Sequence, residues 1–152
     1  MTPDRIFAIV NAIALISWVL LGLLPRQRWV TSTLTGTVVP ALLATVYTAI
    51  VADMWSRSPG GFSTLPAVET LFSNRWLLLA GWTHYLAFDL LVGNWEVRDA
   101  RDRGIPHALI LPCLILTFLF GPAGWMLYLS LRTTRRRRVS TITANSATPR
   151  PI

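Results

Sequence analysis

Long apolar runs separated by short polar segments dominate the hydrophobic pattern of this chain. Charged side chains are absent from Ile6–Pro25, from Trp29–Ala52 and from Gly104–Leu131, and Asp89 is the only charge inside Arg75–Trp95 after its first residue. A membrane-spanning helix needs about 20 mostly apolar residues. Backbone groups in hydrocarbon must also be paired within their own segment, and no alternation typical of a barrel strand is present. The pattern therefore predicts membrane helices.

We expect an all-α fold, an integral membrane four-helix bundle formed by residues 1–132. The apolar runs predict membrane spans at about 6–24, 34–54, 75–95 and 105–131. The first run is long for the apolar core of a signal peptide, and Leu24-Pro25-Arg26 is a poor cleavage site, so we expect this helix to be retained. Residues 133–152 are rich in Arg and then in Ser, Thr, Ala and Pro, and are expected to be a disordered tail.

Charged residues, glycine and proline refine the expected ends of two of these helices and of one loop. The third helix is expected to continue into water and to end at Gly104, because two pairs of opposite charge lie four residues apart beyond Trp95: Arg98 with Asp102 and Asp99 with Arg103. The fourth is expected to break at Gly121-Pro122-Ala123-Gly124, where small residues also leave room for helix contacts and an oligomer. Segment 56–74 is expected to be a loop whose Leu65–Phe72 part lies at the membrane interface.

Charge sets the expected orientation and partners. All 14 basic residues are arginine, and the net charge is +7. Four spans would place nine arginines on the side of both termini and five on the other, so the positive-inside rule predicts cytoplasmic termini in a bacterial inner or plasma membrane. Arg132 and Arg135–Arg138 directly follow the last span, which indicates a topology signal and contact with membrane lipid rather than nucleic-acid binding.

Two polar residues inside the third predicted span are the strongest functional candidates. An ionised Asp at mid-span costs about 2.5–3.5 kcal/mol, so Asp89 is a functional candidate that should face the bundle interior. His84 precedes Asp89 by five residues, about 140° around a helix, so the two flank a pocket without sharing a face. Glu96 does share the side of Asp89, and with Asp99 it would extend a carboxylate line that suits a proton or ion path. The structural alternatives are an Asp89–Arg pair, a cap on the broken fourth helix, and a His84 hydrogen bond between helices.

Other polar and aromatic residues are expected to line the same interior. Asn11 lies in the first span, Trp18 and Trp82 lie deeper than an interfacial aromatic belt, and His107 lies at the start of the fourth span. No metal site is expected, because neither His–x–x–His nor Glu–x–x–His occurs. No cofactor is expected either, since the chain has no glycine-rich phosphate loop or dinucleotide fingerprint.

Several short motifs together resemble one family. They are Asn11 with Trp18 and Leu24-Pro25-Arg26, then Trp82-Thr83-His84-Tyr85-Leu86-Ala87-Phe88-Asp89-Leu90, then Gly104-Ile105-Pro106-His107, Pro112-Cys113-Leu114 and Gly121-Pro122-Ala123-Gly124. From Phe7 to Arg132 the chain resembles the small membrane proteins related to plant abscisic-acid-deficient protein four, the neoxanthin-synthesis protein, a family with a domain formerly of unknown function. Trp-x-His-x4-Asp and Gly-Pro-x-Gly carry the resemblance jointly.

The resemblance implies a function as well as a four-helix membrane fold. In plants the family is tied to the conversion of violaxanthin to neoxanthin, a redox-neutral epoxide opening that forms an allene. By this resemblance the chain is an isomerase of a carotenoid or related isoprenoid, with Asp89 as the acid and His84 or Glu96 as the base. Trp82, Asn11, Trp18 and His107 would bind the substrate. The alternative hypothesis is a non-catalytic membrane protein that binds or organises pigment, lipid or a partner complex.

Overall fold

The computed structural model describes residues 1–146, with side chains through Thr134. The described residues form helices and no strand, which confirms the all-α prediction. They divide into two compact units, residues 1–94 and residues 95 onward. The elements in order are α1 (Pro3–Leu23), η1 (Trp29–Val38), α2 (Val39–Met54), η2 (Trp55–Arg57), α3 (Leu65–Ser73), α4 (Arg75–Asp102), η3 (His107–Leu109), α5 (Leu111–Phe120) and α6 (Pro122–Ser146).

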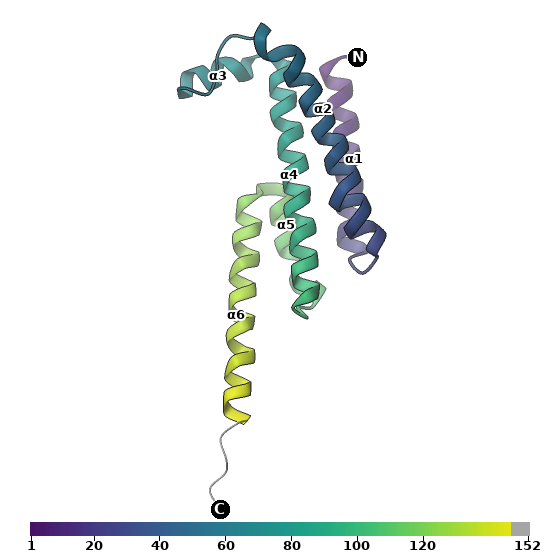
Figure 1. Cartoon of the computed structure of the whole chain (residues 1–152), viewed down its shortest axis with the longest axis vertical. Helices are drawn as coiled ribbons and strands as arrows, with labels where there is room; N and C mark the ends of the chain where they lie inside the picture. Colours follow the sequence, from purple (N-terminus) through teal and green to yellow (C-terminus); the bar gives the residue numbers. More distant parts are fainter. Residues whose placement is uncertain (147–152) are drawn as a thin grey trace, which may run out of the picture. The chain divides into compact units, whose positions relative to one another are not determined.

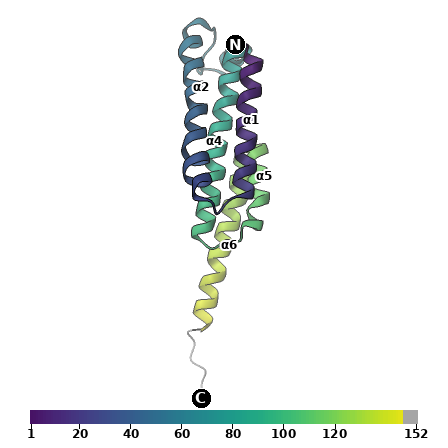
Figure 2. The same ribbon diagram turned by 90° about the vertical axis from the view of Figure 1, so that its right-hand side faces the viewer.

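The first unit contains α1, the continuous helical segment η1–α2 and the first part of α4, which lie side by side in both views (Figures 1 and 2), and it also includes η2 and α3. Ile50 of α2 packs there with Leu79 and Ala80 of α4 in an apolar core. Among the described residues, three helices are long and apolar enough to cross a membrane: Pro3–Leu23, Trp29–Arg57 and Arg75–Asp102. These correspond to the first three predicted spans.

A π-helix opens the second of these helices, a feature that the hydrophobic pattern did not predict. It covers Trp29–Val38, just before Pro40, which has no backbone N–H to donate. The hydroxyl of Thr35 donates to the carbonyl of Val30 at 2.8 Å, and its oxygen lies 3.3 Å from Oδ1 of Asn94, which shares the same hydrogen. A side chain at Gly36 would come within 3.0 Å of the Asn94 amide nitrogen, so glycine permits close packing of this segment against α4.

The predicted loop after α2 contains a short helix. Thr64 caps α3, because its hydroxyl accepts a hydrogen bond from the backbone N–H of Ala67 at 3.3 Å. Gly60 has a φ of +100°, a conformation that favours glycine, and its backbone lies against Ala67 and Leu71 of α3. The segment that the sequence places at the interface is therefore an ordered helix, and Leu71 is buried.

The second unit differs from the predicted fourth span. The structure divides residues 105–131 into η3, α5 and the start of α6, and α5 and α6 run in opposite directions as a hairpin (Figure 1). Gly121 turns the chain with a φ of +44°, and Pro122 begins the next helix. A Cβ at Gly124 would collide with the backbone of Thr117, so only glycine lets the two arms approach this closely. The predicted break is present, but it produces a hairpin rather than one kinked span.

The two ends of the hairpin bear on two further predictions. As expected, α4 extends beyond Trp95 to Asp102, and Gly104 follows it with a φ of +65°. The tail was expected to be disordered from residue 133, whereas α6 continues to Ser146. Residues 147–152 lie outside the described residues, so for them disorder stays a prediction.

Candidate functional site

A row of polar and aromatic side chains follows one side of the first part of α4. The indole Nε1 of Trp82 donates to Oδ1 of Asn11 on α1 at 3.1 Å. The Trp82 ring also lies 5.8 Å from the ring of Phe7 and 5.3 Å from that of Tyr85, centroid to centroid. Trp82 keeps 41% of its surface exposed. The row therefore joins α1 to α4 and remains open to its surroundings.

Asp89 lies one helical turn beyond Tyr85 and is the charged member of this row. The Tyr85 hydroxyl donates a hydrogen bond to the Asp89 carboxylate. The second carboxylate oxygen, Oδ2, is buried and has no hydrogen-bond partner among the described residues. No cation of the described side chains lies within ion-pair distance of Asp89, so the predicted structural alternative of an Asp–Arg pair is not observed there. A buried polar oxygen without a protein partner is costly, so Asp89 is the carboxylate of this row that calls for an explanation.

Trp18 occupies the α1 side of the same unit, one turn of α4 further on. Its side chain is buried, and a Cβ at Gly93 would collide with its indole ring. The absence of a side chain at Gly93 thus lets α1 and α4 approach around Trp18. Trp18 is therefore buried between α1 and α4, whereas Asn11 is half-buried and Trp82 is exposed.

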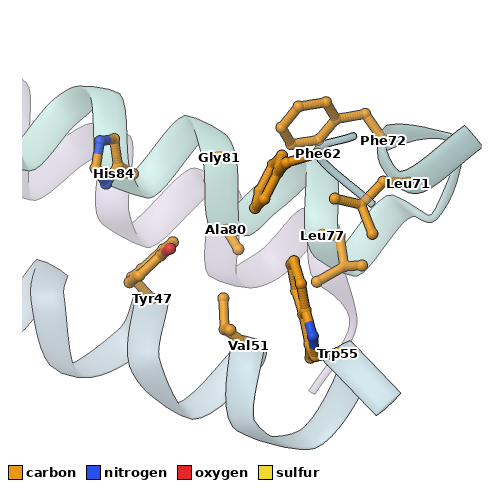
Figure 3. Close-up of a pocket in the computed structure, with 10 residues that line it drawn as sticks. All are labelled: Tyr47, Val51, Trp55, Phe62, Leu71, Phe72, Leu77, Ala80, Gly81 and His84. Atoms are coloured by element: carbon orange, nitrogen blue, oxygen red, sulfur yellow. The ribbon is translucent and has the colours of Figure 1, made fainter. Parts of the chain in front are cut away.

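His84 lies on a different side of α4, as the five-residue spacing from Asp89 predicts. Its ring lies 5.5 Å from that of Tyr47 on α2 and 4.5 Å from that of Phe88. It lines a cavity of about 250 Å³ whose walls come from α2, the α3 segment and α4 (Figure 3). Figure 3 shows Tyr47 reaching from α2 toward α4 beside His84. His84 therefore lines an aromatic cavity on a different side of α4 from the row of Trp82, Tyr85 and Asp89, called the Asp89 row below.

Glu96 belongs to the second unit. It is fully buried, and the hydroxyl of Thr117 on α5 lies 3.0 Å from its Oε1 and 3.2 Å from its Oε2. A carboxylate buried in this way is held by the hairpin. His107, a predicted substrate-binding residue that also lies outside the first unit, begins η3 and is half-buried.

Asp99 connects the end of α4 to α6 within the second unit. Its carboxylate accepts hydrogen bonds from the Tyr128 hydroxyl at 2.5 Å and from Arg103 at 2.8 Å, and Arg132 Nε lies 3.1 Å away. The hydrogen bond to Asp99 raises the pKa of the Arg103 guanidinium, which lies beyond the end of α4. Of the two predicted ion pairs, Asp99–Arg103 is confirmed, whereas Asp102 lies 4.0 Å from Arg101 rather than pairing with Arg98.

The sequence did not predict the hydrogen-bond partners of Asp89, Glu96 and Asn94. Tyr85 lies four residues before Asp89, a spacing that places two helical side chains together, so the signal was available. Thr117 and Thr35 are separated from Glu96 and Asn94 by 21 and 59 residues, and no local pattern connects them. Among the described residues, no group of three His, Cys, Asp or Glu side chains is arranged to hold a metal ion.

Comparisons with known proteins give one match. The model of the family described as ABA DEFICIENT 4-like matches residues 5–128, which is most of the chain. No curated protein and no solved structure matches. The matched region contains Asn11, Trp82 and Asp89, and it ends at Tyr128 within the α5–α6 hairpin. On the strength of this match, which confirms the resemblance seen in its motifs, the chain belongs to the ABA DEFICIENT 4-like family.

Proposed function

We propose that this membrane protein isomerises an epoxide-bearing carotenoid or related isoprenoid, with Asp89 transferring the proton. The single observation that carries the proposal is the buried Oδ2 of Asp89, which has no hydrogen-bond partner while Tyr85 donates to the carboxylate. Membership of a family related to neoxanthin synthesis supports the substrate class. Three helices apolar enough to cross a membrane suit a substrate that is dissolved in lipid.

The reaction needs a proton donor at the epoxide oxygen and a proton acceptor at the neighbouring polyene carbon. Protonated Asp89 gives its proton to the epoxide oxygen, and one carbon–oxygen bond breaks so that the oxygen becomes a hydroxyl. The adjacent carbon then loses a proton, and the electron pair of that carbon–hydrogen bond forms the new double bond of an allene. Product and substrate have equal mass, and no oxidant or reductant is consumed.

The position of the other candidates favours Asp89 for both proton transfers. His84 lines the cavity beside Tyr47, away from the Asp89 row, and the Glu96 carboxylate is held by Thr117 in the second unit. The epoxide oxygen and the carbon-bound proton are neighbours in the substrate, so the carboxylate that gives one proton can take the other. This second transfer restores Asp89 to its protonated form and completes the cycle without a separate base.

The row that precedes Asp89 is suited to an extended apolar substrate. Phe7 and Trp82 are exposed aromatic residues at a groove of about 220 Å³ between α1 and the start of α4. The Asp4–Arg75 ion pair closes the polar end of this groove. A polyene lying along the aromatic rings would present its ring end to Asp89, about 10 Å further along the helix.

The test is pigment analysis in a host that makes epoxy-carotenoids. The wild-type chain and its Asp89→Asn form are expressed separately, their amounts in the membrane are matched, and the lipid extracts are separated. We expect a new isomer of unchanged mass with the wild type and a loss of about a hundredfold or more with Asp89→Asn. An identical isomer yield from both forms, or no isomer from a folded wild type, would refute the proposal.

A non-catalytic binding function has its own supporting observation, the aromatic cavity that contains His84. The cavity lies among α2, the α3 segment and α4, and its walls include Trp55, Phe62 and Phe72 (Figure 3). The Ala80→Phe change would fill it. If the protein only binds pigment there, this change removes the bound pigment; if Asp89 catalyses the isomerisation, isomer formation survives it.

A further inference from the structure

The α5–α6 hairpin is too short in both arms to cross a membrane. Its apolar first arm, His107–Phe120, has 14 residues and spans about 21 Å at the helical rise, against a hydrocarbon core of about 30 Å. Gly121 then reverses the chain, and the apolar part of α6 reaches only ten residues, about 15 Å, before Arg132. Two short apolar arms of this kind suit a segment that enters the hydrocarbon and returns to the face from which it came.

Contacts within the second unit show where the returning arm ends. Arg132 lies 3.1 Å from Asp99, and its guanidinium carbon lies 5.6 Å from the centre of the Trp95 ring. Tyr128, one turn earlier on α6, donates to the same Asp99 carboxylate. The start of the basic tail is thus beside the end of α4, where the hairpin begins. Both ends of the hairpin therefore lie at one level.

This arrangement changes the distribution of arginines expected from sequence. Three crossings and a returning hairpin would put the C-terminal tail on the membrane face that the end of α4 reaches, and the N-terminus on the opposite face. The membrane face that holds the end of α4 and the tail would then carry eleven of the 14 arginines. The opposite face would carry Arg5, Arg57 and Arg75. The positive-inside rule makes the eleven-arginine face cytoplasmic. The sequence prediction of nine arginines on one face and five on the other depended on residues 105–131 crossing the membrane.

We propose that the arginines at the mouth of the hairpin form a binding surface for anionic phospholipid headgroups of the cytoplasmic leaflet. This mouth surface consists of Arg98, Arg101, Arg103 and Arg132, and the sequence adds Arg135–Arg138 directly after it. The guanidinium group pairs with phosphate oxygens through two parallel hydrogen bonds. Asp99 and Asp102 offset only two of the four charges at the mouth, and the exposed Trp95, whose ring lies beside Arg132, is typical of a headgroup region. This inference does not depend on catalysis at Asp89.

The first experiment tests the arrangement with the full chain in right-side-out membrane vesicles. Cys113 is replaced by Ser, and one cysteine is introduced by Thr2→Cys, Ser63→Cys or Thr134→Cys, each at an exposed position. We expect a membrane-impermeant thiol reagent to label the first two without treatment and Thr134→Cys only after permeabilisation. Equal accessibility of Thr2→Cys and Thr134→Cys in intact vesicles would overturn the returning hairpin.

The second experiment measures lipid selectivity of the full chain in bilayer discs that contain phosphatidylglycerol and phosphatidylcholine. After detergent extraction, native mass spectrometry counts the phosphatidylglycerol that stays bound. We expect the Arg98→Gln/Arg101→Gln protein to lose about fivefold in phosphatidylglycerol retention per arginine removed. The matched Arg5→Gln/Arg57→Gln protein, changed on the opposite face, should retain the wild-type level. No preference in the wild type, or an equal loss in both variants, would overturn the proposed surface.

Discussion

Asp89 and Glu96 are two carboxylates on one helix with opposite surroundings. The fully buried Glu96 has the Thr117 hydroxyl within 3.2 Å of both its oxygens. Half-buried Asp89 has a hydrogen bond from Tyr85 and a second oxygen, Oδ2, that is buried without a partner. A hydrogen-bonded buried group stabilises one fold, whereas a buried oxygen without a protein partner reduces stability.

The comparison also separates two uses of small residues. Gly93 makes room for the indole side chain of Trp18 in the first unit, and Gly124 makes room for the backbone of Thr117 in the second. A side chain can rotate away from a new Cβ, but a helix backbone cannot do so without opening the hairpin. The surroundings of Glu96 are therefore more rigidly specified than those of Asp89.

The largest expected effect on stability comes from Gly124→Ala. The new Cβ would collide with the Thr117 backbone, and overpacking of this kind costs about 1–3 kcal/mol. The measurement is the loss of folded protein during a denaturant titration in mild detergent. Gly22→Ala is the matched control, because no atom lies within 4 Å of its added Cβ. Equal stability of both variants would show that the hairpin is looser than described.

Thr117→Val should have the next largest effect, because it removes the hydroxyl that donates to Glu96. A buried carboxylate deprived of a donor costs about 1–3 kcal/mol. Thr117→Ser keeps the hydroxyl and should recover most of the lost stability. If Thr117→Val is as stable as Thr117→Ser, the Glu96–Thr117 bond does not support the hairpin and the contrast with Asp89 weakens.

Tyr85→Phe tests the surroundings of Asp89 in the comparison with Glu96. The change removes the hydroxyl that positions the carboxylate but keeps the ring against Trp82, so we expect about a tenfold fall in isomer yield, about 1.4 kcal/mol. Thermal unfolding of the purified protein should remain close to that of the wild type. A variant that loses stability and activity together would indicate that Tyr85 supports the fold rather than the site.

Trp82→Phe should produce the smallest change. It removes the hydrogen bond to Asn11 between α4 and α1, which is worth about 0.5–1.5 kcal/mol in net stability. Asn11→Leu should give a similar loss, and the double variant should lose little more, because both changes break one bond. Fully additive losses in the denaturant titration would show that the Trp82–Asn11 bond carries no coupling.

The first unit was largely predictable because its information is local. Two charge-free runs and a third run interrupted only by Asp89 predict three long helices, and the five-residue spacing of His84 and Asp89 predicts their different sides. The extension of α4 beyond Trp95 was also predictable, since Asp99 and Arg103 are four residues apart. All of these patterns repeat within a few turns of one helix.

The hairpin was not predictable by the same reasoning. A charge-free run such as 105–131 has the length of a span, and hydropathy alone does not distinguish a kinked crossing from two short antiparallel arms. The distinction depends on Gly121 reversing the chain and on contacts such as Thr117–Glu96 and Arg132–Asp99, whose partners are 21 and 33 residues apart. The π-helix before Pro40 likewise contacts a distant residue, Asn94, through Thr35.

The most direct test of the contrast is the isomer yield of Asp89→Asn against that of Glu96→Gln, at matched amounts of folded protein in the membrane. Both changes replace a carboxylate by an amide of similar shape. We expect Asp89→Asn to lower the yield about a hundredfold or more and Glu96→Gln to leave it within about threefold of the wild type, because only Asp89 has an oxygen available to a substrate. Equal losses in the two variants, or a larger loss with Glu96→Gln, would contradict the assignment of proton transfer to Asp89.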